Sequence, residues 1–365
     1  MGLPSYFIVF MGLMTATPGS AAPVSADNPS VQYFGRFDMS KTGHALFDWP
    51  GVVIQAVFEG TSCSAVLKGT VACFDVHIDG KFAGTVKNRP GTAVVPLASG
   101  LPDGRHLLRL EKRSESFAGP VSFGGFMLDS GKRVVKPPKM PARKIEFIGD
   151  SYTAGFANEH EGRECDPAAA DSIILATTNA NKAFGPLVAA AFGAQYQIIA
   201  QSGKGLVRNY NGIDPGKELP SLYDRTLCSS INTPGPYGKW QFSSWKADVA
   251  VIGIGVNDFQ ADPPYADSAA YDREYARLIA KLRAQYPGVR IVCCATRVWP
   301  TDALIPRVKA IVARQKAKGH DDVVYFEYAT ENNALYGHPS LADHRIIADS
   351  LIPVIARITG WRRQP

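Results

Sequence analysis

The hydrophobic pattern of this chain changes its period once, at a stretch that has no period of its own. Before that stretch, apolar and polar residues alternate in short runs, whereas after it continuous apolar runs are separated by segments with helical spacing. The stretch, VVKPPKMPARK at 134–144, holds three prolines and four lysines or arginines. Because one regular layer does not carry both periods, the 365 residues are predicted to form two domains joined by a linker at 134–144.

The part before the linker is predicted to be an all-β sandwich over residues 30–133. In CFDVHIDG, Phe74, Val76 and Ile78 fall on one face, and the run ends at the turn residues 79–80. The same style recurs in VVIQAVFEG, GTAVVPL, RHLLRLEKR and VSFGGFML. Several short strands separated by turn signals, without a helical pattern between them, are typical of a two-sheet sandwich.

The part after the linker, 145–365, is predicted to be an α/β domain with helices on both faces of a five-stranded parallel sheet. Its apolar runs are KIEFIGD, QYQIIAQSG, ADVAVIGIGVND, RIVCCAT and DVVYFEYA. Helical spacing between them is shown by Tyr271, Tyr275, Leu278, Ile279 and Leu282. Right-handed crossovers bring the carboxyl ends of all such strands to one edge, where ligands of open α/β sheets bind.

The first 22 residues are predicted to be a signal peptide cleaved near Ala22, which makes the protein secreted or periplasmic. SYFIVFMGLMTATPGSAA has an apolar core followed by small residues. That core is too short to span a bilayer, so no membrane is expected as a partner. The net charge of +6 is spread along the chain without a basic run, which is poor evidence for nucleic-acid binding.

The six cysteines do not suggest a metal site, because CxxC and HExxH are both absent. Their even number is compatible with disulfides in an oxidising compartment. Cys165 and Cys228 lie in loop-like stretches and could be joined by a disulfide, although the pairing cannot be deduced from the sequence. Cys293 and Cys294 are adjacent within an apolar strand, where buried free thiols are the simpler interpretation.

Three possible hydrogen-bond donors follow three successive strands of the α/β domain. Ser151 ends the first run, and its N–H begins a helix; Gly203 ends the second run in AQSGKG, and Asn257 ends the third in GIGVND. A lone serine here would be interpreted equally well as a helix cap. Because an oxyanion hole needs donors that converge on one point, the three together predict one at this edge.

A histidine is available in GHPSLADH, which contains His338 and His344. His338 precedes Pro339 in a loop and can reach across the strand ends, whereas His344 should already lie on the last helix, where a structural role is favoured. We therefore predict His338 as the general base for Ser151 in acyl transfer.

The motifs IGDSYTAG, QSGKG, GVND and HPS together resemble the four sequence blocks of the SGNH, or GDSL-like, hydrolases. The resemblance implies that Ser151 is the nucleophile, that Gly203 and Asn257 supply the other oxyanion donors, and that His338 is the base. The nucleophile elbow G-x-S-x-G of ordinary α/β-hydrolases is absent.

The first domain extends the resemblance to nearly the whole chain after the signal peptide. FDWPGVVIQAVFEGTS, VHIDG and DGRHLLRLEKRSES are similar to the jelly-roll domain of carbohydrate esterase family 2. This resemblance implies a cofactor-free esterase that removes acetyl groups from plant cell-wall polysaccharides or oligosaccharides such as xylan and glucomannan, with no obligate protein partner. The alternatives are an SGNH lipase, thioesterase or small-ester hydrolase, and a non-catalytic carbohydrate-binding protein.

The chain departs from the superfamily at position 335, where Leu335 stands in place of an aspartate. The resemblance to family 2 allows a dyad in which a backbone carbonyl orients His338, and Glu331 is a weaker candidate for the missing carboxylate. Without a carboxylate, the base is expected to ionise near the ordinary histidine value of about 6.5. Structural roles are favoured for Asp150 and Asp258.

Aromatic residues at the same edge are candidates for sugar recognition. Tyr210 follows Gly203 in the chain and Trp299 follows the fourth strand, so both are predicted to bind substrate. Trp245, before the third strand, is interpreted as a core residue.

Overall fold

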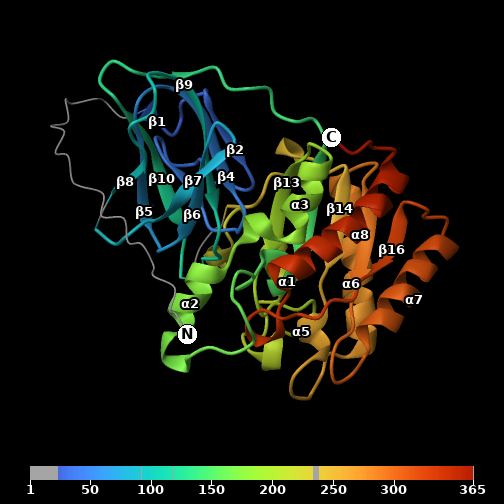
Figure 1. The fold of residues 1–365 in the computed structure, drawn as a ribbon. Helices are drawn as coiled ribbons and strands as arrows, with labels where there is room; N and C mark the ends of the chain where they lie inside the picture. The colour runs from blue at the N-terminus through green and yellow to red at the C-terminus, as the bar shows by residue number, and fades with distance from the viewer. Residues whose placement is uncertain (1–23, 92, 117, 233–237, 365) are drawn as a thin grey trace, which may run out of the picture.

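The computed structural model describes residues 24–91, 93–116, 118–232 and 238–364, and the predicted signal peptide at 1–22 lies outside them. Figure 1 shows a β domain, coloured blue to teal, beside an α/β domain coloured green to red. The order of the two domains along the chain is the order predicted from the change of hydrophobic period.

The first domain is a sandwich of two antiparallel sheets, as predicted. Its strands are β1 (Val24–Ser25), β2 (Val31–Phe34), β3 (Ala45–Phe47), β4 (Val53–Gly60), β5 (Cys63–Gly69), β6 (Cys73–Ile78), β7 (Lys81–Lys87), β8 (Val94–Ala98), β9 (Gly104–Lys112), β10 (Val121–Leu128) and β11 (Val134–Val135). One sheet has the order β1-β10-β5-β8 with β3 beside β10, and the other has the order β11-β4-β9-β6-β7 with β2 beside β4. The rings of Phe47 and Phe74, one from each sheet, lie 6.2 Å apart in the core between the sheets.

The second domain carries a parallel sheet. Its strands are β12 (Lys144–Gly149), β13 (Gln195–Ala200), β14 (Val249–Gly253), β15 (Arg290–Ala295) and β16 (Val323–Glu327). Its helices are α1 (Ser151–Ala154), α2 (Ala170–Thr177), α3 (Phe184–Ala191), α4 (Leu219–Tyr223), α5 (Val256–Phe259), α6 (Ser268–Gln285), α7 (Leu304–Ala317) and α8 (Leu341–Thr359). In the described residues the five strands run in the order β13-β12-β14-β15-β16, which confirms the predicted α/β fold.

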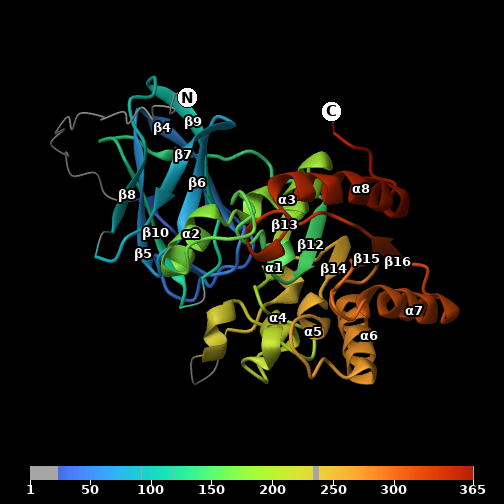
Figure 2. The ribbon, with the colours of Figure 1, turned by 60° about the horizontal axis from the view of Figure 1, so that its bottom comes forward.

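Helices cover both faces of this sheet because successive strand residues point to opposite sides. Val251 packs with residues of α3 and α8, whereas its neighbour Ile252 packs in the cluster that contains Tyr271 and Tyr275 of α6. Figure 2 shows α3 and α8 on one side of the sheet, and α4, α6 and α7 on the other. Figure 1 shows α1 and α5, which follow β12 and β14, on the same lower side of the domain.

The segment between the domains is extended. Val134–Val135 pairs with β4 on the sandwich and Lys144 begins β12, so the strand-free part of the predicted linker is 136–143.

The two domains are joined by buried polar contacts as well as by apolar packing. Arg36 of the sandwich lies 3.2 Å from Glu146 of β12, and both side chains are fully buried. Trp49 donates its indole N–H to the Thr226 carbonyl at 3.0 Å. Because buried charges are stable only when they are paired and hydrogen-bonded, these contacts fix the position of the sandwich on the α/β domain.

The six cysteines are free thiols, so the possible bridge between Cys165 and Cys228 is not formed. Cys228 is buried at the domain interface, where its N–H donates to Asp48 at 2.9 Å. The Cys165 thiol instead lies 3.6 Å from the Tyr336 hydroxyl. Cys165 lies in an irregular segment and Cys228 begins a short 3-10 helix, Cys228–Asn232. The sequence does not show that one of them is buried against the sandwich.

Candidate active site

Ser151 and His338 meet at the carboxyl edge of the sheet. Ser151 is the first residue of α1, directly after β12, and its Oγ lies 2.9 Å from Nε2 of His338. Gly149, the last residue of β12, permits this arrangement, because a Cβ there would lie 2.1 Å from Oγ1 of Thr153 and 2.7 Å from the Gly253 carbonyl oxygen. The serine is therefore presented by a helix that packs directly against the strand ends.

The imidazole of His338 is oriented by a main-chain carbonyl. Its Nδ1 lies 2.9 Å from the carbonyl oxygen of Leu335, the position at which the superfamily has an aspartate. The side chain of Leu335 is fully buried, which fixes the carbonyl. With the proton on Nδ1 donated to this oxygen, Nε2 has a lone pair that can accept the proton of Ser151.

Burial makes His338 less basic, whereas a carboxylate partner would make it more basic. Burial lowers its pKa to about 4, and the Leu335 carbonyl opposes this shift only in part. The rings of Phe156 and Tyr152 contribute to the enclosure, with centroids 4.5 and 5.6 Å from the imidazole. The value near 6.5 expected from the sequence is therefore wrong, because it took account of the missing carboxylate but not of the aromatic enclosure.

Other candidate groups near the base have structural contacts. Glu331 is exposed, and its main chain is held by Asp343 and Arg163. In the described part of the chain, its carboxylate makes no hydrogen bond to His338. His344 lies on α8 as expected, fully buried, and its Nδ1 accepts the N–H of Phe184 at 3.2 Å.

Asp150 caps the helix that presents Ser151. Its Oδ1 accepts the N–H of Tyr152 at 3.1 Å, and its carbonyl accepts from Thr153 and Ala154. The residue is fully buried, and burial raises its pKa to about 7. These contacts agree with the structural role favoured for Asp150 from the sequence.

The predicted oxyanion donors all lie at the same edge as Ser151. The N–H of Ser151 belongs to the first turn of α1, where N–H groups lack helical partners. Gly203 follows β13 with φ at +77°, a conformation that favours glycine. Asn257 lies in α5, after β14, and donates from Nδ2 to the Lys204 carbonyl at 2.8 Å. Because Nδ2 carries two hydrogens, the second remains for a ligand.

Asp258 holds the turn that contains Gly203. Its carboxylate accepts three backbone N–H groups, at 2.8 to 3.0 Å, from residues 206–208. The residue is fully buried, and burial raises its pKa to about 6. Asp258 thus links the turn after β13 to α5. These hydrogen bonds give a physical basis to the structural role that the sequence favoured for Asp258.

Ser151, Gly203, Asn257 and His338 line one cavity of about 880 Å³. Both predicted aromatic residues lie on it: Tyr210 is 41% exposed and Trp299 is 80% exposed. Trp245 instead packs in the core, as interpreted from the sequence.

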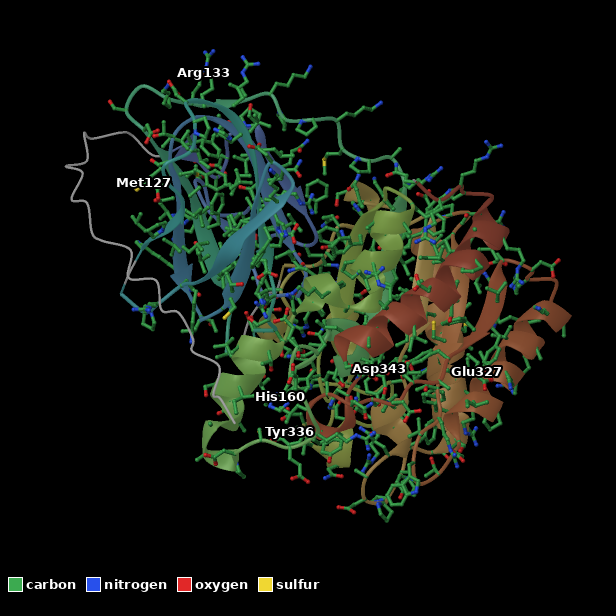
Figure 3. All side chains as sticks on the ribbon, viewed as in Figure 1. Met127, Arg133, His160, Glu327, Tyr336 and Asp343 are labelled. Atoms are coloured by element: carbon green, nitrogen blue, oxygen red, sulfur yellow. The ribbon has the colours of Figure 1, made fainter. Side chains whose placement is uncertain are left out.

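The cavity also has walls that the sequence did not suggest. Tyr336 is 55% exposed on it, and Phe156 and Arg163 come from the segment after α1. Figure 3 shows Tyr336 on the lower side of the molecule with His160, whereas Arg133 lies at the far end of the sandwich. The one available signal for Tyr336 was its position two residues before His338.

Comparisons with known proteins agree with this geometry. A model described as the carbohydrate esterase 2 N-terminal domain matches residues 33–138, and one for the GDSL-like lipase/acylhydrolase family matches 147–346. An acetylxylan esterase/glucomannan deacetylase of Cellvibrio japonicus is 34% identical, with 86% of each chain covered. The chain belongs to carbohydrate esterase family 2.

Other members of the family show the same relation. This family 2 esterase is 34% identical to the cellulase/esterase CelE of Acetivibrio thermocellus over 92% of its own length but spans only 40% of that relative. The structure of an active-site mutant of a family two carbohydrate esterase from Clostridium thermocellum superposes with a TM-score of 0.82 at 32% identity. It covers 92% of this chain and 100% of the other.

In the part of the chain that the structure describes, no group of three or more His, Cys, Asp or Glu side chains is placed so that it could hold a metal ion. The described helices include none that is long and apolar enough to cross a membrane.

Proposed function

We propose that this family 2 esterase is exported and removes O-acetyl groups from plant cell-wall polysaccharides or oligosaccharides, such as xylan and glucomannan, through a serine acyl-enzyme. The observation that carries the proposal is the 2.9 Å contact between Ser151 Oγ and His338 Nε2 within an open cavity. The substrate class is supported by the name of the Cellvibrio relative and by a family two structure in complex with cellohexaose. Export is supported by the sequence of residues 1–22.

In the proposed mechanism, Ser151 attacks the acetyl carbonyl while His338 takes the hydroxyl proton on Nε2. The oxyanion that forms accepts hydrogen bonds from the N–H groups of Ser151 and Gly203 and from Nδ2 of Asn257. His338 then returns the proton to the sugar oxygen, which leaves as a hydroxyl. Water, activated by the same imidazole, hydrolyses the acetyl-serine and releases acetate.

The Leu335 carbonyl stabilises the required tautomer of His338 throughout this cycle. It carries no net charge, so it stabilises the imidazolium less than a carboxylate would. The low pKa of His338, about 4, means that the base is already neutral in mildly acidic surroundings. Exposed Tyr210 and Trp299 offer faces on which sugar rings can stack.

The proposal is tested by acetate release from acetylated xylan and acetylated glucomannan and by 4-nitrophenol release from 4-nitrophenyl octanoate, with Ser151→Ala in parallel. Release from a polysaccharide that the variant abolishes supports the proposal. Preference for the octanoate ester would favour the lipase alternative, and sugar binding without any hydrolysis would favour the non-catalytic one. Either result contradicts the proposal.

A further inference from the structure

A carboxylate from the sandwich domain reaches the turn that carries Gly203. Glu115 lies in the segment after β9, and its Oε1 accepts the N–H of Ser202 at 2.6 Å while its Oε2 accepts the Ser202 hydroxyl at 2.5 Å. Glu115 is 8% exposed. Ser202 directly precedes Gly203, so both oxygens of this carboxylate act on the residue next to a proposed oxyanion donor.

The position of Ser202 determines where the N–H of Gly203 points. That N–H belongs to the peptide bond between the two residues, and a planar peptide moves as one unit. Packing around the Cα of Gly203 does not fix this peptide, because a Cβ at this position would have no neighbouring atom nearer than 3.9 Å. The orientation of the donor therefore depends on contacts made by the residues on either side of it.

The turn at 202–208, here called the oxyanion turn, is held at both ends by buried carboxylates. Asp258 binds the N–H groups of residues 206–208 from the α5 side, and Glu115 binds Ser202 from the sandwich. Asn257 holds the middle of the turn through the Lys204 carbonyl. Of the two ends, only the one at Ser202 is held by a carboxylate of the sandwich domain.

The segment that carries Glu115 is itself anchored. The guanidinium of Arg113 contacts Asp75 at 3.3 Å on the sandwich and also contacts Glu159 of the α/β domain. The carbonyl of Arg113 accepts the N–H of Ala180 at 3.0 Å. Glu115 is thus delivered from a fixed segment and not from a free loop.

We propose that Glu115 is a positioning residue for the oxyanion hole, so that the sandwich domain completes the active site of the α/β domain. The inference rests on the proposed function, since it requires Gly203 to be an oxyanion donor. Without Glu115, Ser202 loses the acceptors of its N–H and its hydroxyl. The Gly203 carbonyl still accepts the Tyr210 N–H at 2.8 Å, but the peptide on the N-terminal side of Gly203 is no longer anchored through Ser202, and its N–H leaves the position that the transition state needs. Misplacement of about 1 Å in such a site can reduce the rate roughly 100-fold.

A matched control exists at the same domain interface. Asp48 is also a buried sandwich carboxylate, and it accepts the N–H groups of Cys228 and Ser229, each at 2.9 Å, and the Ser229 hydroxyl at 2.6 Å. It therefore resembles Glu115 in burial, charge and partners but does not act on the oxyanion turn.

The experiment compares Glu115→Ala, Glu115→Gln and Asp48→Ala by kcat and KM for 4-nitrophenyl acetate, together with thermal unfolding. We expect Glu115→Ala to lower kcat about 10- to 100-fold with KM changed less than about threefold. Glu115→Gln should recover most of the loss, because its oxygen can accept the N–H and its amide can donate to the hydroxyl. Asp48→Ala should lower the unfolding temperature while kcat stays within about twofold of wild type.

The proposal is overturned if folded Glu115→Ala keeps wild-type kcat, or if Asp48→Ala loses kcat to the same degree. Should Glu115→Ala fail to fold, Ser202→Ala removes one of the two contacts, and a kcat equal to wild type there would also overturn it. Ser151→Ala separates the two hypotheses. Activity in that variant contradicts the proposed function, whereas an inactive Ser151→Ala beside a fully active Glu115→Ala contradicts only the role of Glu115.

Discussion

The histidine loop at 331–338 and the oxyanion turn at 202–208 meet at Ser151, but different chemical groups hold them. The imidazole of His338 is oriented by the neutral Leu335 carbonyl. The oxyanion turn is bound at its two ends by the carboxylates of Glu115 and Asp258. Negative charge in this site therefore fixes backbone donors and does not raise the basicity of the histidine, which separates it from a serine triad with an aspartate beside the base.

The largest expected effect is on the histidine side. His338→Ala should lower kcat by at least roughly 10⁴-fold, nearly as much as Ser151→Ala, because the serine then lacks its base. The measurement is acetate release from an activated ester by folded protein. His344→Asn is the matched control, since Asn can still accept the Phe184 N–H, and we expect its kcat to stay near wild type. Residual activity above one tenth of wild type in His338→Ala would show that another group is the base.

The next effect is on the oxyanion side. Asn257→Ala should lower kcat by roughly 10²- to 10³-fold, the usual loss for one oxyanion donor, while KM changes less. Steady-state kinetics with the same ester give both constants. An effect confined to KM would identify Asn257 as a binding residue and leave the oxyanion hole one donor short.

Asp258→Asn should have an intermediate effect. Asn keeps one acceptor oxygen, but its amide group faces backbone N–H groups of residues 206–208, so at least one buried donor loses its partner. We expect the free energy of unfolding to fall by about 1 to 3 kcal/mol and kcat to fall by less than the loss in Asn257→Ala. Denaturant unfolding and kinetics on the same preparation test this. A loss near 10⁴-fold with stability retained would mean that Asp258 is a third catalytic member.

The smallest effect is expected at Glu331. Its carboxylate is exposed, and an exposed charge contributes little, so Glu331→Gln should keep kcat within about threefold of wild type. A matched measurement on His338→Ala sets the scale. A large loss of kcat in Glu331→Gln would mean that the Glu331 carboxylate assists His338, and the histidine loop would then also depend on a negative charge.

The features that depend on local pattern could be predicted from the sequence. The two domains could be predicted from the change of hydrophobic period. Residues that follow successive parallel strands must lie at the same edge of the sheet, so the proximity of Ser151, Gly203 and Asn257 could also be predicted. Their roles in catalysis stay a proposal.

What could not be predicted depends on contacts between distant segments. Glu115 acts from the other domain, and no local pattern marks which residue of a sandwich loop will reach Ser202. The pKa of His338 depends on enclosure by Phe156 and Tyr152, whose orientation only the fold determines. Whether Cys165 and Cys228 form a bridge could not be decided for the same kind of reason, because the sequence does not show which of the two faces the domain interface.

If His338 acts as a base without a charged partner, the ionisation of its own imidazole should show this. A pH-rate profile alone would mix this step with others, because burial raises the pKa of Asp150 to about 7 and that of Asp258 to about 6.

Imidazole nitrogen resonances of ¹⁵N-histidine-labelled protein, with His338 assigned by its absence in His338→Ala, report the group itself. The neutral form is favoured by burial, so we expect a neutral imidazole protonated on Nδ1 that takes up its second proton only as the pH falls through its pKa of about 4. A midpoint at or above the ordinary value of about 6.5 would show instead that a negative charge stabilises the imidazolium and that His338 has a charged partner.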